Sequence, residues 1–313
     1  MTDTKIFGEI VLTQVPRLLG LGDRKDLSPT FGCFDRYYWH YALKDFSNAR
    51  AQEVVLLLSL LYQNNFEGNI FYHNAQVKKW LFAAADFWAG LQHSDGSFDE
   101  NYPNERSFVA TAFTSYAMAE AANCVQDAIF LKKISMPLLK SGSWLSKNIN
   151  PDVANQMAGS AAALYTLFTV LGEKKFEIAA KKRIEEVATM RGPGGYLLEY
   201  GGYDIGYLSI SISYLAKYYK ASGNSVAKEL LYGAEKFVAS KLDEYGHYDW
   251  KNTSRKTQYI YPHGFRIMES SVLDKITNGL ENNKILNPVW MDDVFCLPLA
   301  IDYMQTALEG DKC

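Results

Sequence analysis

The sequence predicts an all-α fold, an (α/α)6 toroid of about six helical hairpins in a single domain. Polar loops recur near residues 45, 96, 148, 195, 246 and 292, at spacings of about 51, 52, 47, 51 and 46 residues. After each loop, a mostly apolar helical stretch is followed by an amphipathic one. A period of this size is typical of a repeated supersecondary unit. An apolar helix must be buried on nearly all sides, whereas an amphipathic helix can cover it.

Closure of the six units into a ring is favoured over an open α-solenoid. The predicted inner helices carry small residues, such as Ala110, Ala112 and 159–163, and no terminal capping unit is evident. No shift in composition marks a second domain. The chain is therefore expected to comprise an N-terminal lead-in with an aromatic lid segment, residues 1–46, and the toroid, residues 47–313.

The helices are expected in chain order. A first helix spans 6–21, and the non-periodic cluster FGCFDRYYWHYALKDF then either closes over a site or packs its rings onto the helical body. Asn74 and Ser47-Asn48 have helix-capping chemistry, Gly172 can stop a helix, and Pro137 marks a break. Inner helices are expected over 49–63, 108–122, 153–172, a stretch ending near 223, 259–270 and 294–308, and amphipathic helices over 75–91, 126–147, 173–190, 225–242 and 272–286.

The composition excludes several classes of function. The net charge is −3 with no basic block, which disfavours nucleic-acid binding. Cysteines 33, 124, 296 and 313 lack CxxC spacing, so no metal site or disulfide framework is expected, and free thiols fit a reducing cytosol. No signal peptide and no uncharged run of ~20 residues is present, so we expect a cytoplasmic protein without a membrane span. Phosphate-binding glycine motifs are absent, and no cofactor is expected.

The period-marking loops all join an outer helix to the next inner helix, so a toroid brings them to the same end. Their polar and aromatic residues should converge on one concave mouth, the default binding site. The candidates are Arg36, Trp39 and His40 from the lead-in, Asp95 and Glu105 from the second loop, Asn155 from the third, Tyr203, Asp204 and Tyr207 from the fourth, and Arg255, Tyr259, His263 and Arg266 from the fifth.

These residue types match the chemistry of proton abstraction from a uronic acid, as in a lyase or an epimerase. A guanidinium neutralises the carboxylate, a Tyr or His removes the C5 proton, and a second group protonates the leaving oxygen. We expect Tyr203 and His263 as the acid–base pair, and Arg255 and Arg266 as carboxylate clamps. The expected partner is a saccharide, and a protein partner or a homo-oligomer stays open.

Three alternatives remain open. Asp95 or Glu105 paired with Asp204 suits glycoside hydrolysis. The chain could equally be a non-catalytic saccharide-binding or polysaccharide-assembly protein. In the structural interpretation, Asp152 and Asp204 are helix N-caps rather than site residues.

The sequence shows two resemblances to known toroid proteins. The stretch NINPDVANQMAGSAAALYTL, with Asn150 and Asn155, and the following EYGGYDIGY resemble the helical domain of heparinase II/III-type polysaccharide lyases over roughly residues 45–310. This resemblance implies a toroid with lyase activity, although the large β-sandwich that follows it in such lyases has no counterpart here. The segment WAGLQHSDGSF resembles the QW motif of squalene-hopene cyclases and prenyltransferase β-subunits, which implies a terpene cyclase-like alternative. The DxDD motif of those cyclases is absent, because Asp292-Asp293 lacks the first Asp.

Overall fold

The computed structural model describes residues 4–310, so Cys313 and the outermost residues of the two predicted segments lie outside the described residues. Within that range the chain is helical, and only isolated bridges occur in place of strands. The elements are α1 (Lys5–Gly20), α2 (Arg36–Trp39), η1 (Ala49–Glu53), α3 (Val54–Gln63), α4 (Ala75–Leu91), α5 (Phe108–Val125), α6 (Ala128–Leu145), α7 (Ala154–Leu171), α8 (Lys174–Ala188), η2 (Pro193–Gly195), α9 (Ile205–Ser222), α10 (Ser225–Lys241), α11 (His263–Ile267), α12 (Val272–Glu281), η3 (Pro288–Trp290) and α13 (Asp293–Leu308).

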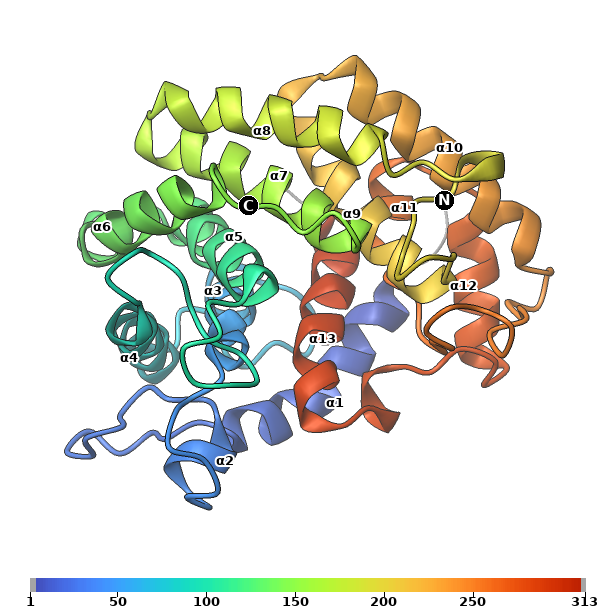
Figure 1. Cartoon of the computed structure of the whole chain (residues 1–313). Coiled ribbons are helices and arrows are strands. Elements are labelled where there is room, and N and C mark those ends of the chain that lie inside the picture. The colour runs from blue at the N-terminus through green and yellow to red at the C-terminus, as the bar shows by residue number, and fades with distance from the viewer. Residues whose placement is uncertain (1–3, 311–313) are drawn as a thin grey trace.

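The helices form two concentric rings, which confirms the predicted toroid. In the inner ring, α3, α5, α7, α9, α11 and α13 each contact the next, and α13 contacts α3 (Figure 1). The helices α4, α6, α8, α10 and α12 lie outside them (Figure 1). The inner helices are almost wholly buried, and their small residues let them approach closely. At Gly159 of α7, for example, a Cβ would lie 2.3 Å from the ring of Phe113 on α5.

The first helix completes the outer ring. Helix α1 packs along α13, where the rings of Phe7 and Tyr303 meet edge-on at 5.1 Å. Arg17 near its end pairs with Asp293 at the start of α13, with 2.8 Å between Nη2 and Oδ1. Helix α1 therefore covers the last inner helix, α13, and belongs to the packed toroid.

A repeated glycine turn explains the period of the sequence. In four loops, a glycine of positive φ packs against the backbone of a following outer helix. Two residues after each of these glycines comes a buried apolar or aromatic side chain. The glycines are Gly32, Gly96, Gly195 and Gly246, and the buried residues are Phe34, Phe98, Leu197 and Tyr248. A Cβ at Gly96 would lie 2.4 Å from the carbonyl oxygen of Lys140 in α6, so only glycine fits this contact.

The third loop makes the corresponding contact differently. It lacks such a glycine, and the buried Arg183 of α8 reaches into it instead. The guanidinium donates to the carbonyl oxygens of Leu145, at 2.8 Å, and Asn148, at 2.7 Å. The loop is therefore fixed by side-chain hydrogen bonds rather than by close backbone packing.

Several local expectations need correction. The predicted inner helix over 259–270 is reduced to the single turn α11, and residues 256–262 before it have no regular secondary structure. Gly264 of α11 packs against the backbone of Ile212, with its notional Cβ 2.7 Å from that residue's carbonyl carbon. Helix α6 continues through Pro137 without the expected break. Asp152 is exposed and does not cap α7, whose N-cap residue is Val153.

The described part of the chain holds no helix that is both long and apolar enough to cross a membrane. Across residues 4–310, no group of three or more His, Cys, Asp and Glu side chains is arranged to hold a metal ion.

Candidate functional site

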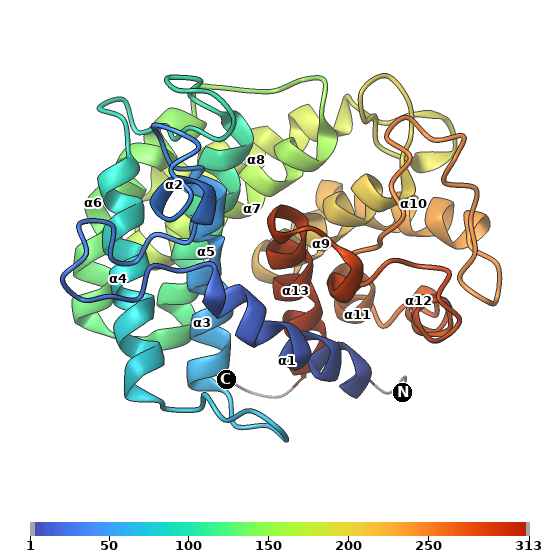
Figure 2. The same ribbon diagram turned by 90° about the horizontal axis from the view of Figure 1, so that it is seen from below.

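The loops that mark the period gather with α2 at one end of the ring, the upper edge in Figure 2. Helices α5, α7, α9 and α13 begin at this end, which we call the N-terminal mouth. The mouth contains a central pocket inside the inner ring, an aromatic rim, and a side pocket next to α1 and α2.

The central pocket is built around a buried ion pair. Arg50 Nε donates to Glu53 Oε1 at 2.7 Å, and Arg50 Nη1 lies 3.6 Å from Glu100 Oε1. The guanidinium also lies 5.0 Å from the ring centroid of Phe113. Burial raises the pKa of Glu53, against the lowering effect of Arg50. The pocket's volume of about 20 Å³ is about that of one water, so no larger ligand fits inside it.

Deeper in the lumen lies a second buried charge pair. Lys217 Nζ of α9 is 3.6 Å from Asp302 Oδ2 of α13, and Ser213 donates its hydroxyl to the same carboxylate. The ammonium lies over the rings of Tyr116 and Tyr214, at 5.4 and 5.0 Å from their centroids. Burial lowers the pKa of Lys217, although Asp302 acts in the opposite direction.

The rim joins a guanidinium to a set of aromatic rings. Arg255 lies 4.4 Å from the ring centroid of Tyr200 and 5.6 Å from that of Tyr207, and the neighbouring Tyr207 raises its pKa against the effect of burial. On the opposite side, the rings of Tyr259 and Phe295 are 6.1 Å apart. Within residues 4–310, no carboxylate lies within ion-pair distance of Arg255, although Asp204 is near enough to interact with its charge. This exposed cation therefore has no carboxylate bound to it within the described range.

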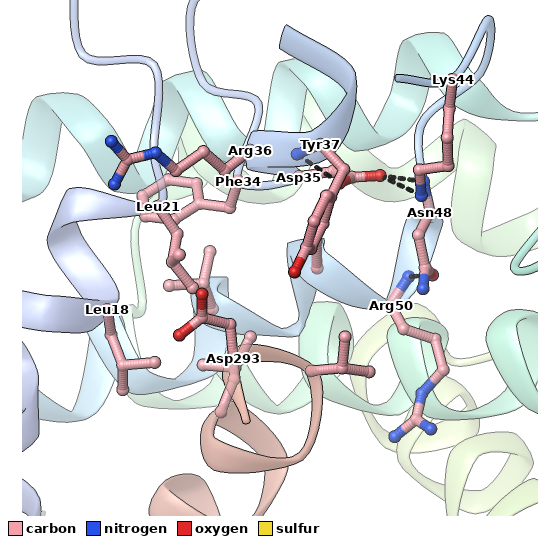
Figure 3. A pocket seen from close by; sticks show the side chains of 14 residues that line it. Leu18, Leu21, Phe34, Asp35, Arg36, Tyr37, Lys44, Asn48, Arg50 and Asp293 are labelled. Atoms are coloured by element: carbon pink, nitrogen blue, oxygen red, sulfur yellow. Dashed lines mark hydrogen bonds and ion pairs between the residues drawn. The ribbon is translucent and has the colours of Figure 1, made fainter. Parts of the chain in front are cut away.

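The side pocket lies between α1, α2 and the start of α13, and Arg50 lines both it and the central pocket. Figure 3 shows the Tyr37 ring and the Asp293 carboxylate extending into it, while Arg36 points to one side. Asp35 holds its wall together by accepting from the Asn48 backbone N–H at 2.7 Å and pairing with Lys44 at 2.8 Å. The pocket is small, about 60 Å³, and its walls are largely apolar.

Four of the candidates from the sequence lie together at the mouth: Asp204, Tyr207, Arg255 and Tyr259. Asp204 is the N-cap of α9, accepting from the backbone N–H of Tyr207 at 3.0 Å. It also accepts from the Thr253 hydroxyl at 2.7 Å and from the Thr257 backbone N–H at 3.1 Å. The predicted N-cap role of Asp204 is thus confirmed, and its buried carboxylate fastens the fifth loop to α9.

Tyr203 lies on the outer side of the inner ring. Its ring packs against Phe237 of α10, at 5.1 Å between centroids, and against Tyr196, at 5.5 Å. The structure therefore separates Tyr203 from the rim formed by Tyr207 and Arg255.

Asn155 is hydrogen-bonded to the carboxyl group of Glu199. Its side-chain amide donates to Glu199 Oε2 at 2.7 Å, and its backbone N–H donates to Glu199 Oε1 at 2.8 Å. The Ser211 hydroxyl also donates to Glu199 Oε1, at 3.3 Å. Glu199 is fully buried, and burial raises its pKa to about 8 despite these three donors.

The candidate acids of the second loop stabilise that loop. Asp95 accepts from the backbone N–H and the hydroxyl of Ser97, at 3.0 and 2.6 Å, and pairs with Arg106 at 3.1 Å. The exposed Glu105 accepts from the backbone N–H groups of residues 100, 101 and 102. Both carboxylates are thus already hydrogen-bonded within their own loop.

The lead-in candidates surround the short helix α2. Trp39 Nε1 donates to the carbonyl oxygen of Leu21 at 2.7 Å, which anchors α2 to the end of α1. His40 is exposed beside it, with 5.1 Å between ring centroids. Arg36 Nη1 donates to the carbonyl oxygen of Gly20 at 3.4 Å.

His263 and Arg266 lie at the other end of the ring. His263 Nε2 is 3.0 Å from Glu309 Oε2, and Arg266 Nη2 donates to the Glu309 carbonyl oxygen at 3.0 Å. Glu309 directly follows the last residue of α13. The expectation that the polar residues of the fifth loop all reach the mouth is therefore wrong for these two, which contact the end of α13 instead.

The sequence reasoning missed four charged residues of the lumen, Arg50, Glu53, Lys217 and Asp302. A signal for each was present, because each is a charge next to or inside an otherwise apolar inner stretch: ARAQEVVLLLSLL, ISISYLAKYY and LPLAIDYMQ. A charge in such a helix is costly to bury without a partner, and it therefore marks a paired or functional position.

No protein-family model and no curated protein matches this chain. Solved structures do match it in fold. A cellobiose 2-epimerase from Bacillus thermoamylovorans is 10% identical, with a TM-score of 0.64 over 96% of this chain and 98% of that one. A family 76 glycoside hydrolase from a bovine Bacteroides thetaiotaomicron strain is 13% identical, with a TM-score of 0.66 over 98% and 78%. A family 88 glycosyl hydrolase from Bacteroides vulgatus is 9% identical, with a TM-score of 0.61 over 98% of both chains. The chain thus has the α/α toroid fold of these carbohydrate-active enzymes.

Proposed function

We propose that this protein is an enzyme that acts on an acidic saccharide at the N-terminal mouth, by abstracting a proton as a lyase or an epimerase does. The observation that carries the proposal is Arg255, a guanidinium that lies over the rings of Tyr200 and Tyr207, with no carboxylate at ion-pair distance within residues 4–310. A guanidinium in this setting can bind a ligand carboxylate through two hydrogen bonds.

The aromatic rim supports a saccharide as the substrate. Tyr200 is 47% exposed and Phe295 is 38% exposed. Exposed aromatic rings beside a guanidinium are suited to stacking on the apolar face of a sugar ring. The likeness in fold to an epimerase and two glycoside hydrolases agrees with this substrate class.

In the proposed reaction, Arg255 neutralises the uronate carboxylate, which makes the neighbouring C5 proton acidic. Tyr207, next to the same guanidinium, acts as the general base that takes that proton. In elimination, the electron pair then forms the C4–C5 double bond while the C4–O bond breaks, and the leaving oxygen takes a proton. Tyr200, whose ring lies against the same guanidinium, gives that proton, and its raised pKa keeps it protonated at neutral pH.

The test is the ultraviolet absorbance of unsaturated uronate, followed with purified protein and a panel of uronate polysaccharides. Tyr207→Phe is expected to lower the rate at least ~100-fold, the usual contribution of a general base. Tyr203→Phe is the matched control, because its ring lies on the outer side against α10, and its rate should stay within about twofold. Arg255→Lys should mainly raise KM, because the bidentate contact is lost.

Two results would decide against this proposal. A Tyr203→Phe variant that loses activity while Tyr207→Phe keeps it would move the chemistry away from the rim. A wild-type protein that binds uronate oligosaccharides, with neither absorbance change nor C5 hydrogen exchange into solvent, would be a binder rather than a catalyst.

Glycoside hydrolysis is a second candidate, because of the carboxyl groups around Arg50. Glu53 is buried with a raised pKa, as a general acid requires, and Glu100 lies on the other side of the same guanidinium. Two carboxyls held in different environments can divide the acid and base roles. Release of reducing ends that is abolished in Glu53→Gln and kept in Tyr207→Phe would favour this reaction over elimination.

A further inference from the structure

The side pocket is larger than the central pocket, and most of its wall is apolar. The apolar side chains come from the end of α1, the residues before α2, the segment η1–α3 and the start of α13: Leu18, Leu21, Phe34, Ala51, Val54, Val294 and Leu297. A water needs roughly 10–15 Å³ of such a cavity, so the pocket's volume of about 60 Å³ holds about four to six atoms of that size. A whole sugar ring is too large for this pocket, whereas a short substituent on the ring is not.

The charged side chains that line the side pocket already have partners in the protein. These pairs are Asp35 with Lys44, Arg50 with Glu53, Asp293 with Arg17, and Arg36 with the carbonyl oxygen of Gly20. An ionic ligand would lose its hydration here and would have to compete with one of these contacts. The pocket therefore suits a neutral group.

Two polar side chains of the pocket each keep one free hydrogen-bonding atom. Asn48 accepts from the Arg50 backbone N–H through Oδ1 at 2.8 Å, and its Nδ2 donates to no group within residues 4–310. Asp293 accepts from Arg17 through Oδ1 at 2.8 Å, which leaves Oδ2 without a donor in the same range. Both residues are partly exposed, and neither of the two free atoms is shut off from the surface. The pocket thus offers a ligand one donor and one acceptor.

The arrangement of these two groups matches an amide. Figure 3 shows Asn48 and Asp293 on opposite sides of the Tyr37 ring, which extends into the pocket. A trans amide carries its C=O and its N–H on opposite sides of one plane. An ester has no N–H for Asp293, and a hydroxyl group has no apolar part for the wall. An acetamido group has all three parts: a carbonyl oxygen, an N–H and a methyl group.

The side pocket borders the rim at the start of α13. Val294 lines the pocket, and the next residue, Phe295, has its ring 6.1 Å from that of Tyr259. Arg50 lines both the side pocket and the central pocket. A ligand that reaches into the side pocket therefore has the rest of its structure at the mouth.

We propose that the side pocket is a binding subsite for the acetamido group of an N-acetylated sugar. The carbonyl oxygen of this group accepts from Asn48 Nδ2, its N–H donates to Asp293 Oδ2, and its methyl group lies among the apolar side chains. The sugar ring stays outside the pocket, at the mouth. This inference rests on the proposed function in taking a saccharide as the ligand of the mouth, and it is independent of the reaction there.

The test is saturation-transfer difference NMR of the whole chain, titrated with N-acetyl-D-glucosamine and, separately, with D-glucose, which lacks the acetamido group. The acetyl methyl protons should receive the strongest saturation, because they lie deepest in the protein. D-glucose should bind at least ~10-fold more weakly, because it leaves the apolar wall and both free polar atoms without a partner.

Two substitutions and their controls locate the binding. Asn48→Asp keeps an acceptor for the Arg50 backbone N–H and replaces the free donor by an acceptor, so it should weaken binding of the acetylated probe roughly tenfold. Asn224→Asp makes the same change at the N-cap of α10 and should leave binding within about twofold. Ala51→Leu fills the pocket and should abolish the preference for the acetylated probe, whereas the smaller change Ala51→Ser should keep it.

Circular dichroism of each variant checks that the helices are intact, so that a loss of binding reports on the pocket. The proposal is overturned if N-acetyl-D-glucosamine does not bind, if D-glucose binds equally well, or if Asn48→Asp binds as well as the wild type. The absorbance assay on uronates is read separately. Acetyl-dependent binding without elimination would contradict the proposed function alone, and elimination without acetyl-dependent binding would contradict the subsite alone.

Discussion

The most informative perturbation of the fold is Glu199→Gln. Glu199 is fully buried between α7 and α9 and accepts three hydrogen bonds, two from Asn155 and one from Ser211. Burial raises its pKa from the ordinary 4.5 to about 8, so the folded protein keeps this carboxyl protonated at neutral pH. Glutamine is neutral, has the same shape, and still offers an acceptor to the Asn155 backbone N–H.

The sign of the effect follows from proton binding. Between pH 4.5 and about 8 the folded chain holds a proton on Glu199 that the unfolded chain has released. The contribution of this group to stability is therefore complete below pH ~4.5, falls as the pH rises, and is lost above about 8. Each pH unit inside this window removes up to about 1.4 kcal/mol from the free energy of unfolding, so the change from pH 5 to pH 8 amounts to up to ~4 kcal/mol.

The assay is urea unfolding of the wild type and of Glu199→Gln at pH 5, 6, 7 and 8. The variant lacks the titration, so the difference in unfolding free energy between the two chains should shift in its favour by up to ~4 kcal/mol across this range. Other titrating groups cancel in that difference. Parallel pH profiles, differing by less than ~1 kcal/mol from pH 5 to pH 8, would refute the reasoning, because they would mean that the three donors outweigh burial and keep Glu199 ionised.

Two further substitutions test the packing of the loops, both by urea unfolding at neutral pH. Asp204→Ala removes a buried N-cap that accepts three hydrogen bonds, and it should lower the free energy of unfolding by about 2–4 kcal/mol. Asp152→Ala is the control, because Asp152 is exposed and caps no helix, and it should change this free energy by less than ~0.5 kcal/mol. Equal losses in the two variants would contradict the assigned cap. Gly246→Ala should lower the free energy of unfolding by more than ~2 kcal/mol, because the new Cβ would lie 2.5 Å from Gly279 Cα and φ is +75°. Gly223→Ala is the control: its φ is similar but its surroundings are open, so it should cost only ~1 kcal/mol. If the Gly246 variant loses no more stability than this control, the close approach to Gly279 is not limiting.

The architecture was predictable because its determinants are local and periodic. A stretch such as VVLLLSLLYQ can only be stable where it is buried on all sides, and its repetition about every 50 residues leaves a ring as the compact solution. The recurring turn at Gly96 is visible in the sequence for the same reason, since the close contact with Lys140 admits no side chain. One unit departs from the period, because α11 is a single turn.

The site was predictable only in part, because the sequence of a loop does not determine the direction in which its side chains point. Tyr203 and Tyr207 are four residues apart, yet the first packs outward on Phe237 and the second faces Arg255, since Asp204 caps α9 between them. His263 reaches Glu309 at the far end, although it follows Tyr259 of the mouth by only four residues.

The sequence by itself determined the class of fold, the helices of the repeat, and the end of the ring at which most of the loops gather. The tertiary structure alone decided which side chains meet there: it joined Arg50 of the first unit to Glu100 of the second, and Arg255 of the fifth loop to Tyr207 of α9. The physical reason is that burial and hydrophobic periodicity act along neighbouring residues of one helix, whereas an ion pair or a hydrogen bond between distant loops depends on angstrom-scale distances that only the closed ring sets.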